Sequence, residues 1–149
     1  MLLQTTEAQS QARDEITWHL AFRSEHILRL VGHEIVAVAQ PPPSRSIGVA
    51  GGGSLELDRT PHERCDMLMP LMRGGSLEDV LNPLRPAGPY LPERRCLTML
   101  RSLLSGLVAM HSHTPPVAHR DVKTHNCMLL HPGDDECILA DLGSARAAR

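Results

Sequence analysis

The chain has 149 residues, one domain's worth, and its 15 Lys and Arg against 17 Asp and Glu give a formal net charge of −2. That near balance argues against a nucleic-acid binder or a membrane-surface module, and the longest apolar runs are far shorter than the roughly 20 residues of a bilayer span. The composition is 42% hydrophobic but holds a single Trp, Tyr and Phe, so Leu, Val, Met and Ala must fill the core. Met1-Leu2-Leu3 shows no secretory signal, so a cytoplasmic location is expected by default.

The first predicted element is a helix from Thr6, where Gln9 would complete a capping box, to about Phe22. Glu15 lies beside the stripe that this helix would turn inward. That stripe comprises Ala12, Ile16, His19 and Phe22. Two short strands follow, predicted at residues 27–31 and 35–38.

A proline run and a glycine run then mark a flexible insert at about residues 40–63, which includes Gly51-Gly52-Gly53. The apolar run Cys65–Leu71 is predicted as a further strand, bounded by Gly74-Gly75. A helix opens at Ser76 with an S-x-x-D cap signature, and prolines and a glycine at 82–93 indicate a loop.

The clearest helix is predicted at Glu93–His111, where apolar residues recur every three or four positions. Cys96, Leu100, Leu103, Leu107 and Met110 carry that repeat. Two apolar runs at 127–130 and 137–140, joined by a loop with Pro132 and Gly133, indicate a β-hairpin.

Cysteine and histidine raise a separate possibility. The four cysteines form no C-x-x-C pair, which suggests reduced, mostly buried thiols. His119, His125, Cys127 and His131 are close in sequence but lack the paired spacing of zinc ligands. A zinc-binding interaction module is therefore kept as a third alternative.

The most informative segment runs His119-Arg120-Asp121-Val122-Lys123-Thr124-His125-Asn126, and Asp141-Leu142-Gly143 follows fifteen residues later. The first stretch resembles the catalytic loop of protein kinases, H-R-D-x-K-x-x-N, and the second resembles their metal-binding D-F-G. The resemblance implies an α+β, protein-kinase-like two-lobe fold. Because Asn126 precedes the first hairpin strand and Asp141 follows the second, antiparallel pairing should return both to one end.

The resemblance also implies roles for these residues. Asp121 would accept the proton of the attacking hydroxyl, and Lys123 would contact the transferred phosphate. Asn126 and Asp141 would supply oxygen ligands for the Mg²⁺ that binds the phosphates of ATP. Arg120 would pair with a phosphorylated activation segment, and His119 would hold the loop by hydrogen bonds.

Upstream, Met67 to Leu77 looks like the fifth strand and hinge of a kinase. Met69 would be the gatekeeper, and backbone groups of Pro70 and Met72 would receive adenine. Glu15 matches the helix glutamate that pairs with a strand lysine in kinases. The flank Asp141–Arg146 resembles the Numb-associated branch, near small lipidated serine/threonine kinases and their plant and algal relatives.

These matches divide the chain into a small-lobe remnant at 1–69, a hinge at 70–75 and the first half of a large lobe at 76–149. The sequence has no G-x-G-x-x-G loop before a strand, no V-A-I-K lysine before Glu15 and no A-P-E motif, so we expect a truncated domain.

The leading hypothesis is a serine/threonine kinase that acts on a protein substrate, since Lys123 is typical of that class. The alternative is an inactive kinase-like fragment that binds protein partners or is a partial gene product. In either case the helix at 93–111 should expose apolar surface, which predicts aggregation or a covering protein partner.

Overall fold

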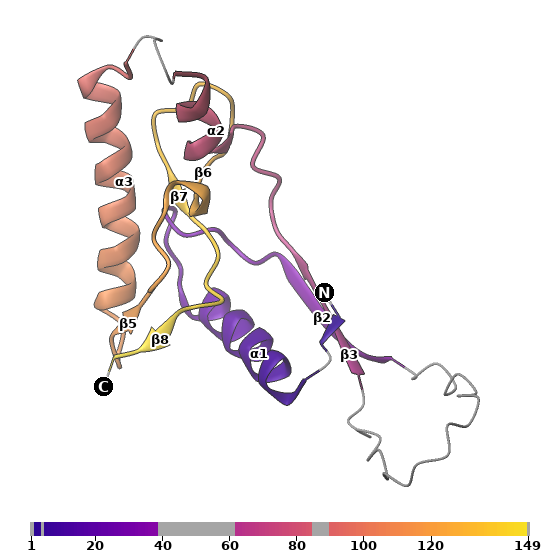
Figure 1. Ribbon diagram of the computed structural model, residues 1–149. Coiled ribbons are helices and arrows are strands. Elements are labelled where there is room, and N and C mark those ends of the chain that lie inside the picture. Colours follow the sequence, from indigo (N-terminus) through magenta and orange to yellow (C-terminus); the bar gives the residue numbers. More distant parts are fainter. Residues whose placement is uncertain (1, 4, 39–61, 85–89, 149) are drawn as a thin grey trace, which may run out of the picture.

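The structure is a computed structural model, and it describes residues 2–3, 5–38, 62–84 and 90–148. Helices and antiparallel strands form the α+β arrangement that the sequence predicts (Figure 1). Within the described ranges, no helix is both long enough and apolar enough to cross a bilayer.

Helix α1 (Thr6–Ala21) confirms the first predicted element, but Thr5 and not Thr6 is its N-terminal cap. The Thr5 hydroxyl oxygen accepts a hydrogen bond from the backbone N–H of Ala8 at 3.1 Å, so one of the unpaired N–H groups of the first turn is satisfied. The helix buries Ala12, Ile16 and His19, as the stripe predicts.

The first sheet contains β1 (Leu2–Leu3), β2 (Gly32–Val38) and β3 (His62–Leu68) in the order β1-β3-β2. Strand β3 begins at His62, inside the predicted insert, and ends at Leu68 rather than Leu71. The rest of that insert, including Gly51-Gly52-Gly53, lies outside the described residues.

The second half of the chain begins with a short strand and a capped helix. Ser76 caps α2: its hydroxyl accepts from the N–H of Asp79 at 3.2 Å, and the Asp79 carboxylate accepts from the N–H of Ser76 at 2.8 Å. This confirms the predicted cap signature. The elements in order are β4 (Gly75–Ser76), α2 (Leu77–Leu81), the 3-10 turn η1 (Asn82–Leu84) and α3 (Glu93–His111).

The predicted hairpin is confirmed, with shorter strands than expected. Strands β6 (Cys127–Leu129) and β7 (Ile138–Leu139) pair antiparallel, and β4 joins the other edge of β6. Sequence reasoning missed a small pairing between β5 (Val117–Ala118) and β8 (Arg146–Ala147). The turn η2 (Thr124–Asn126) leads into β6.

The predicted strand at residues 27–31 is wrong. Ile27 makes one isolated parallel bridge, to Leu139 in β7, and the N–H of Leu28 bonds to the Leu139 carbonyl at 2.8 Å. The N–H of Val31, however, bonds to Leu68 in β3 at 2.8 Å. Because the segment bonds to β7 at one end and to β3 at the other, no single neighbour can form a ladder with it, and it becomes a connector between the two halves.

The largest core cluster lies between α3 and the segments around β5 and β7, and it contains no aromatic side chain. Its buried members are Ile27, Met110, Val117, Leu139, Leu142 and Ala145. This confirms that aliphatic residues and methionine fill the core. Trp18 and Phe22 pack at its edge, with ring centroids 6.3 Å apart.

Candidate active site

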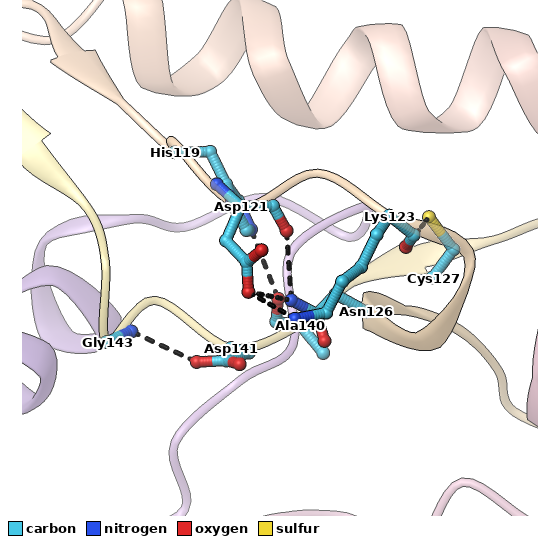
Figure 2. A network of polar contacts seen from close by, with 8 residues as sticks. All are labelled: His119, Asp121, Lys123, Asn126, Cys127, Ala140, Asp141 and Gly143. Carbon is cyan, nitrogen blue, oxygen red and sulfur yellow. Dashed lines mark hydrogen bonds and ion pairs between the residues drawn. The ribbon is translucent and has the colours of Figure 1, made fainter.

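The hairpin brings the two sequence motifs to one end, as predicted (Figure 2). The N–H of Ala140 donates to the carbonyl of Asn126 at 2.8 Å, so Asp141 follows directly on a residue bonded to Asn126. Buried His119 adds a second tie to the same place: its Nε2 lies 3.1 Å from the Ala140 carbonyl oxygen and its Nδ1 lies 3.3 Å from the N–H of Asp121.

These partners fix the state of the His119 ring. A carbonyl only accepts, so Nε2–H donates to Ala140, whereas Nδ1 accepts from the backbone N–H of Asp121. The ring is then neutral, and burial lowers its pKa accordingly. His119 thus holds the loop by hydrogen bonds, in agreement with the role that the resemblance implies.

Asp121 lies at the centre of a charged network (Figure 2). Its Oδ2 is 2.6 Å from Nζ of Lys123 and 2.9 Å from Nδ2 of Asn126. The hydrogen bond from Lys123, followed by that from Asn126, lowers the pKa of Asp121, and the same contact with Asp121 raises the pKa of Lys123. The pair is therefore held as carboxylate and ammonium.

The Asn126 side chain is oriented by the same network. Its amide nitrogen also donates to the backbone carbonyl of Asp121 at 2.9 Å, so both N–H groups are used within the loop. The amide oxygen is left as the group that can ligate a cation. Asn126 itself is 7% exposed, so its position is fixed by packing as well as by hydrogen bonds.

Asp141 has a backbone conformation that sequence reasoning did not predict. Its φ is 64° and that of Arg120 is 69°, a left-handed region that is unfavourable for most side chains. One carboxylate oxygen of Asp141 accepts from the N–H of Gly143 at 3.2 Å. Such backbone strain tends to occur at functional sites, but no sequence signal marked these two positions, since neither is glycine.

Glu15 of α1 lies close to Asp141 and Gly143. A Cβ placed on Gly143 would lie 3.3 Å from both Glu15 Oε2 and Asp141 Oδ1. Burial, together with the charge of Asp141, raises the pKa of Glu15. The two carboxylates therefore approach each other across Gly143.

His19 lies beside Glu15 one turn along the helix, a contact that sequence reasoning missed. Its Nε2 lies 3.9 Å from Glu15 Oε1, and its Nδ1 donates to the Leu28 carbonyl at 2.9 Å. Burial lowers the pKa of His19. The i, i+4 spacing of the two residues was the available signal.

A further contact joins α2 to the catalytic loop. The hydroxyl of Thr124 donates a short hydrogen bond to the carboxylate of Glu78. This contact connects residues 46 positions apart, and neither residue type marked it in the sequence. It anchors η2 to α2.

The predicted hinge residues Met69, Pro70 and Met72 lie outside the hydrogen-bond network around Asp121. Met69 packs against the small core cluster formed by α1 and β3, whereas Pro70 and Met72 line a cavity of about 810 Å³. That cavity is lined by neither Asp121 nor Asp141. Within the described residues, the Pro70 carbonyl and the Met72 N–H form no hydrogen bond, so both backbone groups are free to receive a ligand.

The four candidate zinc ligands do not gather. His119 and Cys127 are buried and bonded to backbone carbonyls, and His125 and His131 are exposed. In the described part of the chain, no three residues among His, Cys, Asp and Glu are placed to hold a metal. All four cysteines are free thiols, and only Cys96 is exposed.

Comparison with known proteins agrees with this geometry. Residues 3–149 match the protein kinase domain. The chain belongs to the protein kinase family. It is 29% identical over 149 residues to serine/threonine-protein kinase 16 of Mus musculus, covering 99% of this chain and 40% of that protein.

Two relatives come from Dictyostelium discoideum. A probable serine/threonine-protein kinase is 27% identical over 135 residues, which is 87% of this chain and 31% of that protein. The serine/threonine-protein kinase fray1 is 41% identical over 78 residues, which is 52% of this chain and 12% of that protein. The chain thus spans less than half the length of each of these relatives and shares their kinase-type α+β fold.

Proposed function

We propose that this chain carries the catalytic loop of a serine/threonine protein kinase, which transfers the γ-phosphate of ATP to a Ser or Thr hydroxyl of a protein. The observation that supports this is the network of Asp121, Lys123 and Asn126, with contacts of 2.6 and 2.9 Å. Asp141 is placed beside it through the bond between Ala140 and Asn126.

In the proposed reaction, the hydroxyl oxygen of the substrate forms a bond to the γ-phosphorus. The bond from that phosphorus to the β–γ bridging oxygen breaks, and ADP leaves. The hydroxyl proton passes to Asp121, which is ionised and therefore able to accept it. Lys123 would balance charge on the transferred group, since its ammonium lies against the same carboxylate.

The donor set suits Mg²⁺. The amide oxygen of Asn126 and the carboxylate of Asp141 are hard oxygen ligands, and one or two protein ligands together with phosphate oxygens are typical for this ion. When bound, Mg²⁺ neutralises charge on the phosphates. Glu15, across Gly143 from Asp141, would pair with a cationic side chain near the phosphates.

Adenine would be received by the free backbone groups of Pro70 and Met72, with Met69 as gatekeeper. This assignment divides the chain into a small lobe at 1–69, a hinge at 70–75 and a large-lobe half at 76–149. One observation supports this assignment: β3 ends at Leu68, and residues 69–72 belong to no helix or strand of the described chain.

We further propose membership of the Numb-associated branch, on the basis of the residues from Asp141 to Arg146, and action on a protein substrate in the cytoplasm.

The first test is binding. Mg-ATP should raise the melting temperature of the chain, because a ligand at a hundred times its dissociation constant stabilises a fold by about 2.7 kcal/mol. Asp141→Asn should abolish the shift, and Asp14→Asn, a carboxylate of α1 outside the network, is the matched control. No shift at millimolar Mg-ATP would favour the inactive-fragment alternative over a kinase.

The second test is transfer. Radiolabel from γ-labelled ATP should enter a generic basic protein at a rate that Asp121→Asn reduces to background. Lys123→Ala should reduce the rate by about 10²–10³, by analogy with the loss of one preorganised charge contact. Transfer that survives Asp121→Asn would refute the assigned base.

A further inference from the structure

The cavity of about 810 Å³ shares Pro70 and Met72 with the proposed adenine site, but Asp121, Asn126 and Asp141 do not line it. Its walls come from the end of α1, the connector to β2, the hinge and the hairpin. Phe22, Leu28, Leu30, Met72, Leu130 and Ile138 form its apolar lining. The volume lies in the range of ligand-binding sites, about 300–1,000 Å³.

The edge of the cavity is also apolar and exposed. Leu20 is 56% exposed and Leu130 is 39% exposed, and both line the cavity. An apolar hollow with an apolar edge on an exposed surface is typical of an interaction site.

The charges on the rim are uneven. Arg23 and Arg29 line the cavity and are exposed, and neither forms an ion pair with an acidic residue in the described chain. Among the described residues that line the cavity, Glu25 is the one acidic residue, and its carboxylate is 89% exposed and lies 3.7 Å from Nε2 of His26. Two guanidinium groups are therefore available to carboxylates, which they bind in bidentate geometry.

The backbone of the connector is available as well. Arg29 and Leu30 form no backbone hydrogen bond to any described residue, although Leu30 is only 7% exposed. Unpaired backbone groups next to an apolar hollow are what an added extended segment bonds to.

We propose that this cavity is a docking site for an acidic peptide segment of a partner protein, with apolar side chains in the hollow and carboxylates on Arg23 and Arg29. A compact ligand with one charge would leave one arginine unused, whereas an extended segment can reach both and can pair with the connector backbone. The proposal does not depend on phosphoryl transfer.

The test is a fluorescence anisotropy titration with a short synthetic peptide of alternating Glu and Leu with a central Phe. The same peptide with Lys at each Glu position is the control ligand. The Glu peptide should bind, and the Lys peptide should not. Arg23→Gln with Arg29→Gln, which removes charge at exposed positions, should weaken binding about tenfold or more. Arg101→Gln on α3 is the matched control and should leave affinity unchanged.

A second variant tests the hollow itself. Ile138→Trp, at a half-buried wall position, should block the apolar side chains and weaken binding while the arginines remain. An unchanged melting temperature would establish that each variant is folded. Equal binding of the Lys peptide, or equal loss with Arg101→Gln, would overturn the proposal. So would self-association that is lost in the double variant without peptide binding, since the occupant would then be a second copy.

Discussion

Helix α3 has a buried inward face and an exposed outward face, and both faces carry apolar residues. The inward face is built from Met99, Ser102, Gly106 and Met110, all buried. The outward face carries exposed apolar residues, namely Leu97, Leu100, Leu104 and Val108, which are between 51% and 62% exposed. The inward face therefore includes the small residues Ser102 and Gly106, while several leucines of the same helix remain exposed.

The backbone around His26 packs closely against the inward face of α3. At Gly106 the backbone carbonyl oxygen of His26 is so close that an added Cβ would lie 2.8 Å from it. That carbonyl also accepts from the N–H of Leu139 at 2.8 Å. Close contact with a backbone selects small residues, so apolar size alone does not identify the buried face.

The largest expected effect is a difference in unfolding free energy between substitutions on the two faces of α3. Met110→Ala removes a fully buried side chain from the main core cluster and should lower the free energy of unfolding by about 2–5 kcal/mol. Leu104→Ala, on the outward face, should change it by about 0.5 kcal/mol or less. Urea unfolding of both variants measures the difference, and similar losses would mean that the outward face is covered in the protein.

The second prediction concerns the close contact between Gly106 and the backbone carbonyl of His26. Gly106→Ala should destabilise the fold by about 1–3 kcal/mol because the new methyl group must displace the His26 backbone, even though Ala favours a helix by about 1 kcal/mol. Ser105→Ala is the matched control. Its hydroxyl only bonds back to the carbonyl of Arg101 at 2.9 Å, so a change within about 0.5 kcal/mol is expected. A stabilised Gly106→Ala would show that α3 does not contact His26.

Sequence patterns predicted the helices well. The bounds of α3 agree with the prediction because leucines and methionines recur at helical spacing along it. The same repeat identified the buried face only in part: Cys96 and Leu100 are exposed, Leu103 and Leu107 are partly buried against the main core cluster, and Met110 is buried. The close backbone approach on that face is at Gly106, which carries no hydrophobic signal.

The connector at residues 27–31 is a segment where an apolar sequence did not form the predicted strand. Residues 27–31 are apolar enough for a strand, but strand formation needs a neighbour along its whole length, and here the ends bond to β7 and β3 separately. Sequence could not foresee this because it depends on how the two halves pack. In the site, the motifs placed Asp121, Asn126 and Asp141 together, whereas the left-handed backbone of Arg120 and Asp141 had no sequence signal.

Burial also changes the protonation of two histidines, His19 and His119. Burial lowers the pKa of His19 and of His119, so the fold holds both neutral while the unfolded chain takes up protons near the ordinary value of 6.5. The stability they contribute is complete above that value and is lost as pH falls below it toward the folded pKa. Each group can add a slope of up to about 1.4 kcal/mol per pH unit.

Urea unfolding measured at intervals from pH 7 down to pH 5 checks this prediction (values chosen to lie above the range in which most carboxylates titrate). His19→Leu should reduce the slope, and His111→Leu, at an exposed position of α3, is the matched control. A slope that His19→Leu does not change would mean that this ring takes up no proton on unfolding.

The smallest effect on stability is expected on the outward face, where the effect on association should be largest. Leu100→Glu with Leu104→Lys places opposite charges one turn apart in the favourable order, worth about 0.2–0.5 kcal/mol, and removes two leucines that are each 51% exposed. The unfolding free energy should hardly move, while sedimentation should show less self-association than in the parent chain. The reason is that an exposed apolar stripe drives association only through its area. If association persisted unchanged in the double variant, another exposed patch, such as the one around Leu71 at 75% exposure, would be its cause.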